Sequence, residues 1–430
     1  MARQMKNSGI EWIGDIPAHW KLKKLKALFL ERKEKNDPIK TDFILSLGAA
    51  YGVVPYAEKE GGGNKAKEDL TDYRLAYPND IVMNSMNIIS GSVGISKYFG
   101  CVSPVYYMLY PRQDNVDPNF YCYLFQTKAF QRSLLGLGNG ILMKESSNGN
   151  FNTVRMRIPM EKLGVQLLPM PDFQEQKRIA EGLERLIVEI DLVMNKTNTT
   201  IEEYKKLKQS IISEVAIRGI RDNRSIKDSG IEYVGNIPAE WEVVKNSRLF
   251  RENVRQPNPN DISLSLSQAD GLVATDDMKE KAMKTSTYEG WKRVCIGDLV
   301  LNRFKAHLGV LFAANLEGMV SFHYGVYEPQ IPLVTKYYEY LCHSDAYRAI
   351  YANKSNGMVV GLQNLSNANF YSVKSLYPPV EEQKEIVDYL DKKCAEIDTL
   401  IAKKTALLEE MESYKKSVIY EYVTGKKEVQ

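Results

Sequence analysis

The sequence reads Ser8-Gly-Ile-Glu-Trp-Ile-Gly-Asp-Ile-Pro-Ala-His-Trp20 near its start and Ser229-Gly-Ile-Glu-Tyr-Val-Gly-Asn-Ile-Pro-Ala-Glu-Trp241 a further 221 residues along. Nine of the thirteen positions are identical, and most of the others are conservative replacements. A repeat with so long a period indicates two similar domains and not a solenoid of small units. We therefore predict an internal pseudo-twofold duplication.

The two copies can be aligned along their whole length, although the difference between matching residue numbers changes along the chain. Asp80-Ile-Val-Met-Asn84 matches Asp298-Leu-Val-Leu-Asn302 at an offset of 218, and Pro171–Lys177 matches Pro378–Lys384 at an offset of 207. From there the offset stays at 207 through Glu421. A changing offset indicates loops of unequal length, whereas a constant offset indicates a regular element. Each copy is thus predicted to be a globular domain followed by a long helix.

Both predicted helices carry the 4-3-4-3 spacing of a coiled-coil seam, with prolines before each helix and none inside. The seam positions are Leu183, Ile187, Ile190, Met194, Thr197, Ile201, Tyr204, Lys208, Ile211 and Val215, then Leu390, Cys394, Ile397, Ile401, Lys404, Leu408, Met411, Lys415, Val418 and Tyr422. We assign the contact between the helices to Ile187, Ile190, Ile201, Cys394, Ile397 and Leu408. Either helix alone could instead be buried against its own domain, but two helices with one register favour antiparallel pairing within the chain.

Composition sets the outer limits of the interpretation. With 430 residues, 44% hydrophobic and 26% charged, the chain is an ordinary globular protein of two or three domains. Five cysteines without Cys-x-x-Cys spacing, and no recognisable signal peptide, predict a cytoplasmic protein without a disulfide or zinc framework. No apolar run is long enough for a membrane span. The net charge of +3 does not by itself indicate nucleic-acid binding, so any basic surface must be local.

The lead-in Ile-Pro-x-x-Trp, the globular region, the helix start Pro378-Pro-Val-Glu-Glu-Gln-Lys384 and the repetition of this cycle resemble the specificity subunits of type I restriction-modification systems. The resemblance covers essentially the full chain. The helix-start motif is its most specific part. In the first copy Asp172, Phe173 and Gln174 replace three of its residues, but Glu175-Gln176-Lys177 and the helix register are retained.

The resemblance implies an α+β fold with two similar mixed α/β target recognition domains, separated by two long antiparallel coiled-coil helices. We divide the chain into a first recognition domain at 1–170, a central spacer helix at 171–221, a second recognition domain at 222–377 and a C-terminal spacer helix at 378–430.

The resemblance also implies a DNA-binding subunit without catalysis of its own. Each recognition domain would read one half of a bipartite site in double-stranded DNA, and the helices would dock two modification subunits. Those partners would carry S-adenosylmethionine and methylate adenine, and restriction subunits, where present, would use ATP and Mg. No cofactor is expected on this chain, which contains no methyltransferase motif and no phosphate-binding loop. A structural coiled-coil scaffold without a nucleic-acid role and a free-standing DNA-modifying enzyme are the alternatives.

Some residues look catalytic without being so. Pro171-Asp172 followed by Glu175-Gln176-Lys177 is similar to a compressed nuclease motif. The second copy lacks the aspartate, because Pro379 stands at the position equivalent to Asp172. We interpret Asp172 as a helix cap. The four histidines, His19, His307, His323 and His343, share no metal-binding spacing, so no metal site is predicted. Trp20 and Trp241 are interpreted as core anchors and not as DNA stackers.

Sequence specificity is expected where the copies share an anchor and then differ. After Asn84 the first copy continues to Asn87, and after Asn302 the second continues with Arg303, Lys305 and His307. Asparagine suits adenine and arginine suits guanine in the major groove. A second divergent segment carries Lys144 in one copy and Gln363 in the other. The DNA-binding candidates are Asn84, Asn87, Lys97, Lys144, Asn302, Arg303, Lys305, His307 and Gln363. Solvated loop residues, or phosphate contacts without sequence information, are the alternative for each of them.

Overall fold

The structure is a computed structural model that describes residues 3–48, 51–59, 65–141, 155–258, 260–268, 270–278, 289–355 and 364–428. The chain forms two compact units: unit 1 comprises Met1–Lys196 and Ala406–Gln430, and unit 2 comprises Thr197–Thr405. Each unit therefore combines one globular part with half of each long helix.

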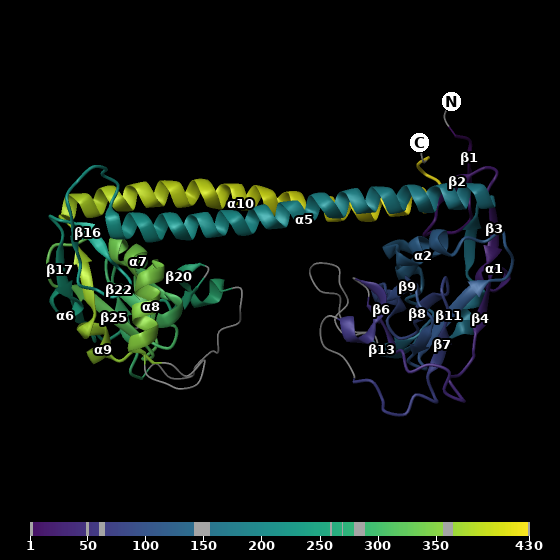
Figure 1. Cartoon of the computed structure of the whole chain (residues 1–430), viewed down its shortest axis with the longest axis horizontal. Helices are drawn as coiled ribbons and strands as arrows, with labels where there is room; N and C mark the ends of the chain where they lie inside the picture. Colours follow the sequence, from purple (N-terminus) through teal and green to yellow (C-terminus); the bar gives the residue numbers. More distant parts are fainter. Residues whose placement is uncertain are drawn as a thin grey trace. The chain divides into compact units, whose positions relative to one another are not determined.

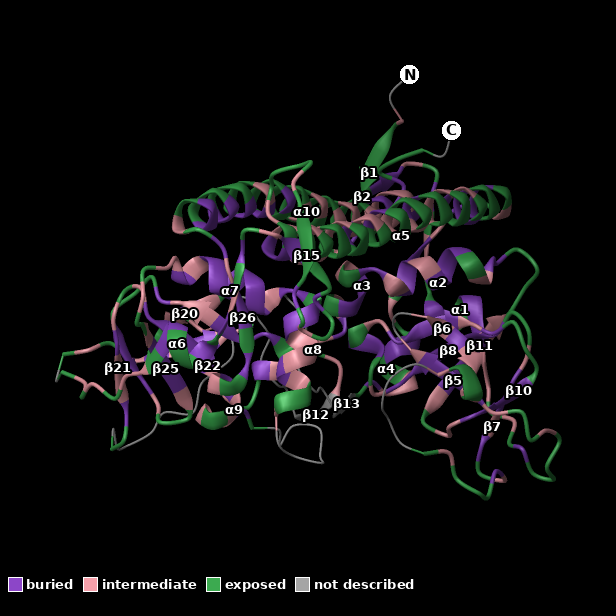
Figure 2. Cartoon of the chain, turned by 60° about the vertical axis from the view of Figure 1, so that its left-hand side comes forward, coloured by how far each residue is buried: buried purple, intermediate pink, exposed green. Residues whose placement is uncertain are grey.

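The two long helices are α5 (Phe173–Arg218) and α10 (Val380–Val423) (Figure 1). The Asp172 carboxylate accepts a hydrogen bond of 2.8 Å from the backbone N–H of Glu175, so Asp172 is the cap predicted from the sequence. Every predicted seam position is buried or half-buried, while the opposite sides of the helices are exposed (Figure 2). The predicted coiled-coil seam is thus confirmed.

Within each unit the two helix halves are joined by an ion pair. In unit 1 the Lys415 ammonium lies 2.6 Å from Asp191, so the first half of α5 lies beside the last half of α10. In unit 2 the Lys208 ammonium lies 2.6 Å from Asp398, so the last half of α5 lies beside the first half of α10. The helices therefore run antiparallel, as predicted.

The remaining elements of unit 1 are short strands and helices. They are β1 (Met5–Asn7), β2 (Asp15–Pro17), β3 (Lys21–Lys24), α1 (Leu25–Leu28), β4 (Phe29–Arg32), β5 (Leu45–Gly48), β6 (Gly52–Pro55), η1 (Tyr56–Glu58), β7 (Arg74–Ala76), β8 (Ile81–Asn84), η2 (Ile88–Ser90), β9 (Val93–Ile95), β10 (Gly100–Val102), β11 (Tyr106–Pro111), α2 (Pro118–Gln126), α3 (Lys128–Ser133), β12 (Asn139–Ile141), β13 (Arg155–Arg157), α4 (Met160–Gly164) and β14 (Leu167–Met170).

Unit 2 repeats most of this series. Its elements are β15 (Ile226–Asp228), β16 (Asn236–Pro238), β17 (Glu242–Lys245), α6 (Asn246–Leu249), β18 (Phe250–Glu252), β19 (Leu264–Ser267), β20 (Gly271–Ala274), η3 (Thr275–Asp277), β21 (Lys292–Val294), β22 (Leu299–Asn302), η4 (Ala306–Leu308), β23 (Leu311–Ala313), β24 (Gly318–Val320), β25 (Tyr324–Pro329), α7 (Thr335–His343), α8 (Asp345–Lys354), α9 (Asn367–Ser372) and β26 (Lys374–Tyr377).

The largest sheet of each unit has four antiparallel strands in the same order, β4-β11-β8-β9 in unit 1 and β18-β25-β22-β23 in unit 2. Helix α2 in unit 1 and helix α7 in unit 2 lie between this sheet and the long helices (Figure 1). The core of unit 1 joins α2, through Phe120 and Leu124, to Leu183 of α5 and Val418 of α10. The four-stranded sheet of unit 1, whose Met83 and Leu109 belong to the same core, is consequently held in a fixed relation to the long helices of its own unit.

The last turn of α10 is part of the core of unit 1. Gly425 follows the helix with a φ of +72°, and a Cβ there would overlap Pro17 and Trp20. The Tyr420 hydroxyl donates a 3.0 Å hydrogen bond to the carbonyl of Trp12, and Val423 is fully buried in the same core. The end of the described chain therefore packs on its beginning.

Candidate nucleic-acid interface

In unit 1 a buried polar cluster joins the lead-in segment to the start of α5. The Trp20 indole N–H donates a 2.8 Å hydrogen bond to Glu175, and the Arg3 guanidinium forms an ion pair with the same carboxylate. The Arg3 guanidinium also lies over the Trp20 ring, 5.5 Å from its centroid, and His19 Nε2 lies 2.9 Å from Glu175. Trp20 is fully buried, as expected of a core anchor.

Unit 2 repeats the cluster with equivalent residues. The Trp241 indole N–H donates a 2.9 Å hydrogen bond to Glu382, and the Arg224 guanidinium lies 2.6 Å from that carboxylate. Glu240 stands where unit 1 has His19 and lies 2.9 Å from Arg224. The shared Glu-Gln motif at each helix start is thus explained in part by a requirement for a carboxylate facing the indole.

The glutamine of that motif fixes the start of the neighbouring helix. The Gln176 side chain accepts a 2.9 Å hydrogen bond from the backbone N–H of Asp117 at the start of α2, and Gln383 accepts a 2.8 Å bond from Val334 at the start of α7. Both amides also donate to the carbonyl of the proline that precedes the helix, Pro171 and Pro378. The most specific motif of the sequence therefore has a structural role: it links the start of each long helix to the start of α2 or α7.

The predicted reading segments begin where β8 and β22 end. The Asn84 side chain accepts a 3.1 Å hydrogen bond from the backbone N–H of Met86, and Asn302 accepts an equal bond from Phe304. Each asparagine thus closes a turn of its own chain, which leads into η2 or η4. We infer that the side-chain oxygens of Asn84 and Asn302 stabilise these turns, so that they already have a hydrogen-bond partner within the chain.

Described residues after the second divergent segment of unit 1, or near the end of that of unit 2, lie beside the first divergent segment. The backbone N–H of Ile158 donates a 3.0 Å hydrogen bond to the carbonyl of Ser85, and Leu365 donates an equal bond to Arg303. Ile158 follows the divergent segment 138–150, Leu365 lies near the end of the divergent segment 356–367, and both side chains are fully buried. The first predicted segment of each unit and these described residues therefore lie at one edge of the sheet, which we call the sheet end. Lys144 and Gln363 themselves lie outside the described residues.

Arg303 lies in a polar network and is not free to reach outward. Its guanidinium is 2.6 Å from Glu252 and donates a 2.7 Å hydrogen bond to the side chain of Asn367. The Lys292 ammonium lies 2.7 Å from the same Glu252 carboxylate, and the Tyr327 hydroxyl also donates to Asn367. Burial next to this network raises the pKa of the Tyr327 hydroxyl. Reading by Arg303 would require it to exchange these partners for DNA.

The other candidates separate into two groups. At the sheet end Asn87 and Lys305 are exposed and His307 is half-buried. Lys97 is also exposed, but it follows β9 beyond Ile95, which pairs with Ile81 at the opposite end of the sheet. Asn87 in unit 1, and Lys305 with His307 in unit 2, therefore lie together with the predicted reading turns, whereas Lys97 does not.

One feature of the sheet end was missed by the sequence reasoning. A second turn, Ser103–Tyr106 in unit 1 and Ser321–Tyr324 in unit 2, is closed by a 3.0 Å hydrogen bond between its first and last residues. It lies beside the asparagine turn, because Tyr106 pairs with Asn84 and Tyr324 with Asn302. The signal in the sequence was a shared serine and tyrosine around two residues that differ between the copies.

Among the residues that the structure describes, no group of histidine, cysteine and carboxylate side chains could hold a metal ion. In the same part of the chain, no helix combines the length and the apolar character that crossing a membrane requires.

Comparison with known proteins identifies the duplicated architecture. The family described as the type I restriction modification DNA specificity domain matches residues 17–203 and 292–410, which together are more than half of the chain. The chain belongs to this family. It is accordingly a DNA sequence-recognition subunit of a type I restriction-modification system and not an enzyme.

Relatives of known sequence or structure agree with this assignment. This specificity subunit is 24% identical over 455 residues to a provisionally assigned specificity subunit of the type I restriction enzyme MjaX of Methanocaldococcus jannaschii. The alignment covers 96% of this chain and 95% of the relative. The type I restriction enzyme MjaVIII specificity subunit of the same organism is 33% identical over 78 residues, 18% of this chain and 17% of the relative.

Two solved structures share the fold. One belongs to a study of complex assembly and conformational transition of the type I R-M system, with a TM-score of 0.68 at 15% identity over 95% of this chain and 98% of that one. The HsdS subunit from Thermoanaerobacter tengcongensis has a TM-score of 0.55 at 13% identity over 98% of this chain and 100% of that one. Nothing in these comparisons favours a scaffold without a nucleic-acid role.

Proposed function

We propose that this specificity subunit reads a bipartite site in double-stranded DNA, one half-site with each sheet end, and docks two modification subunits on its long helices. We further propose the division into 1–170, 171–221, 222–377 and 378–430 as recognition domain, spacer helix, recognition domain and spacer helix. The observation that carries the proposal is that both units have the same turns at the sheet end, with different side chains at equivalent positions.

The two sheet ends have the same turns but offer different groups. Ser85 and Arg303 occupy equivalent positions after the shared asparagine, as do Asn87 and Lys305. Base edges in the major groove differ in their pattern of donors and acceptors, so different side chains on equal backbones suit different base pairs. Two half-sites of unlike sequence are the expected target.

The long helices support docking because their outer sides carry apolar residues at heptad spacing. Leu400, Leu407 and Tyr414 of α10 follow one another at seven-residue intervals and are 42%, 40% and 49% exposed. Leu207 of α5 is 48% exposed and is the counterpart of Tyr414. A row of this kind faces one direction on a helix, and further helices packed on the pair would bury it.

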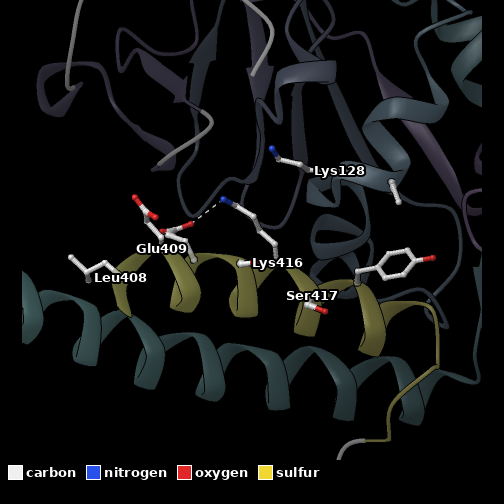
Figure 3. Close-up of a pocket in the computed structure, with 9 residues that line it drawn as sticks. Lys128, Leu408, Glu409, Lys416 and Ser417 are labelled. Carbon is white, nitrogen blue, oxygen red and sulfur yellow. Dashed lines mark ion pairs between the residues drawn. The ribbon is translucent and has the colours of Figure 1, made fainter. Parts of the chain in front are cut away.

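A groove beside α10 in unit 1 offers a second feature for docking. It encloses about 710 Å³ between α3 and α10, and Lys128, Leu408, Glu409, Lys416 and Ser417 line it (Figure 3). The corresponding groove of unit 2 encloses about 400 Å³ and includes Asp345 of α8. There Gln209 of α5 donates a 3.0 Å hydrogen bond to Asp345, which draws the two elements together. The two docking sites are thus similar but not equal.

In this proposal the cofactors belong to the partners. Modification subunits would hold S-adenosylmethionine, and restriction subunits, where they join, would use ATP and Mg. The family assignment supports a complex of the subunit with DNA and modification subunits, and cytoplasm is the compartment we propose for it.

The test of half-site reading is methylome sequencing of cells that express this chain with its modification partner. A bipartite methylated motif is expected. Replacing residues 229–377 by the equivalent domain of a relative should change one half of that motif and leave the other half and its methylation intact. A motif without two parts, or a hybrid that changes both halves, would contradict the proposal.

Docking is tested by co-purification of the modification partner. Leu407→Glu and Tyr414→Glu should each reduce recovery of the partner with little effect on folding, because both side chains are exposed in the free chain. Ala402→Glu is the matched control, since it introduces the same charge at an exposed α10 position on a different side of the helix from the apolar row. Equal recovery with all three variants would show that the helices dock the partner elsewhere.

A further inference from the structure

The two turns at the sheet end of unit 2 present a cluster of aromatic rings to solvent. Phe304 follows the asparagine turn, and Phe322 and His323 are the central residues of the turn Ser321–Tyr324. The Phe322 and His323 ring centroids are 3.9 Å apart, and Phe304 lies 5.4 Å from His323 on the other turn. Phe304 is 39% exposed and Phe322 is 56% exposed. We call these three residues the aromatic cluster.

Rings held in this way are not explained by packing within the chain. A folded domain buries phenylalanine wherever its core allows, and exposed apolar groups that gather at one place mark a contact surface. The two turns that carry the cluster are fixed by hydrogen bonds and by the strand pairing of Asn302 with Tyr324. The rings are therefore held ready before any ligand binds.

Charge at the cluster favours a polyanion. The segments 302–309 and 321–324 contain no aspartate or glutamate, but they do contain Lys305, together with Arg303, whose charge is paired with Glu252. Lys305 is exposed beside Phe304 and forms no ion pair among those found in the described chain. An aromatic surface with cations at its edge matches the combination by which proteins contact bases while neutralising phosphates.

Unit 1 has the same two turns without the rings. Met86, Pro104 and Val105 stand at the positions of Phe304, Phe322 and His323, and Val105 is 38% exposed. The segments 84–91 and 103–106 carry no charged residue. The two units thus have the same pair of turns, which carry small apolar side chains in unit 1 and large aromatic side chains in unit 2.

We propose that the aromatic cluster is a wedge that packs on base faces at one step of the half-site read by unit 2 and partly unstacks that step. Since this inference rests on the proposed DNA-reading function, the occupant is duplex DNA. Apolar side chains that enter a groove and open a base step are an established means of binding DNA. Pyrimidine–purine steps unstack most readily, so a TA or CA/TG step is expected at the position of the wedge. Unit 1 should contact its half-site without such opening.

The experiment uses the full chain in complex with its modification partner and a duplex that carries the methylated motif of the wild-type complex. Single 2-aminopurine bases are placed along both half-sites, because their fluorescence rises when a base unstacks. Outside the methylated adenines, which the modification subunits would themselves turn out of the helix, we expect a rise at one step of the half-site of unit 2 and none in the half-site of unit 1. Phe304→Ala and Phe322→Ala should each abolish the rise and weaken binding about tenfold or more.

Two further variants make the result specific to the cluster. Phe43 and Tyr98 form an exposed aromatic pair in unit 1, 39% and 38% exposed with ring centroids 5.8 Å apart. Tyr98 follows β9 at the opposite end of the sheet, so Tyr98→Ala should leave both affinity and fluorescence unchanged. Phe322→Leu keeps an apolar tip but no flat ring, and should retain part of the affinity while losing the fluorescence change.

The outcomes separate the wedge from the proposed function. If the wild-type complex binds its motif and the cluster variants bind it equally well with the same fluorescence, the wedge is refuted and DNA reading stands. Failure of the wild-type complex to bind the motif would refute both. Loss of the modification partner from the cluster variants, with no step opened in the wild-type complex, would assign the rings to a protein contact and refute the wedge.

Discussion

Replacement of Glu382 by alanine should selectively destabilise unit 2. The Glu382 side chain is 1% exposed, and its carboxylate faces both the Trp241 indole N–H at 2.9 Å and the Arg224 guanidinium at 2.6 Å. Without the carboxylate, the indole donor is left buried without its acceptor, and a guanidinium whose side chain is only 13% exposed loses its nearest counterion.

The magnitude follows from the two losses taken together. Breaking a buried ion pair by removing one partner costs about 3–5 kcal/mol, and a buried donor without an acceptor costs about 1–3 kcal/mol. The two are not additive, because they share one carboxylate. Arg224 keeps Glu240 at 2.9 Å and the carbonyl of Arg218 at 2.7 Å, which offsets part of the loss. We expect the free energy of unfolding of unit 2 to fall by about 3 kcal/mol.

Hydrogen exchange at increasing urea concentration measures each unit separately, which matters because a chain of two units need not unfold in one step. Backbone amides of β22 should report the loss, while those of β8 should exchange as in the wild type. Glu385→Ala is the matched control on the same helix, since Glu385 forms an exposed ion pair of 2.7 Å with Arg221. Exposed pairs contribute at most about 1 kcal/mol.

The reasoning would be refuted if Glu382→Ala lowered the stability of unit 2 no more than Glu385→Ala did. A loss of equal size in both units would be equally damaging, because the cluster of unit 1 uses Glu175 and Arg3 and should be untouched.

Further expectations concern the seam, the reading residues, the spacer and pH. Ile190→Ala, at a seam position 6% exposed, should cost unit 1 about 2–5 kcal/mol in urea unfolding, and a loss below 1 kcal/mol would contradict the seam. If Lys305 reads a base edge, Lys305→Ala should reduce discrimination against the wrong base pair at one position of the half-site by about 1–3 kcal/mol. Arg303→Ala should in addition destabilise the network around Glu252. Methylation of duplexes with single base-pair changes separates the loss of discrimination from the loss of stability. Four residues inserted after Thr200 lengthen α5 by about 6 Å and should add at most one or two base pairs to the spacer of the methylated motif; an unchanged spacer would mean that the partners set it. Burial and nearby cations lower the pKa of His343 to about 4, so the unfolded state binds the proton first as the pH falls. Between about pH 6.5 and 4, unit 2 should lose up to about 1.4 kcal/mol of stability per pH unit, and His343→Gln should remove most of this slope in unfolding measured against pH.

The sequence was sufficient wherever regular periodicity or the duplication itself carried the information. The heptad pattern located the seam, because burial in a coiled coil repeats with the helix. The buried Trp20 and Trp241 were also predicted, since both belong to a segment shared by the two copies, and the cap at Asp172 was predicted from an acidic residue directly before a helix start.

The sequence was insufficient where contacts join residues that are far apart along the chain. Arg303 was assigned to guanine from its residue type, but it pairs with Glu252, 51 residues earlier, and no local pattern reveals this. Lys97 is close in sequence to the reading segment yet lies at the other end of the sheet, because β9 reverses the chain direction. The aromatic cluster arises from two turns that only strand pairing brings together.

The packing of Gly425 and Val423 into the core of unit 1 has a consequence for synthesis on the ribosome. Unit 2 is continuous, Thr197–Thr405, so every residue it needs has been made before the last turns of α10 emerge. Unit 1 begins first, but its core lacks Val418 and Val423 until the last turns of α10 have been made. The domain made first is therefore the last to finish folding, and until then Trp20 and the lead-in lack the surface that covers them. A chaperone that binds exposed apolar segments would find its substrate in the first half of the nascent chain, long after that half has left the exit tunnel.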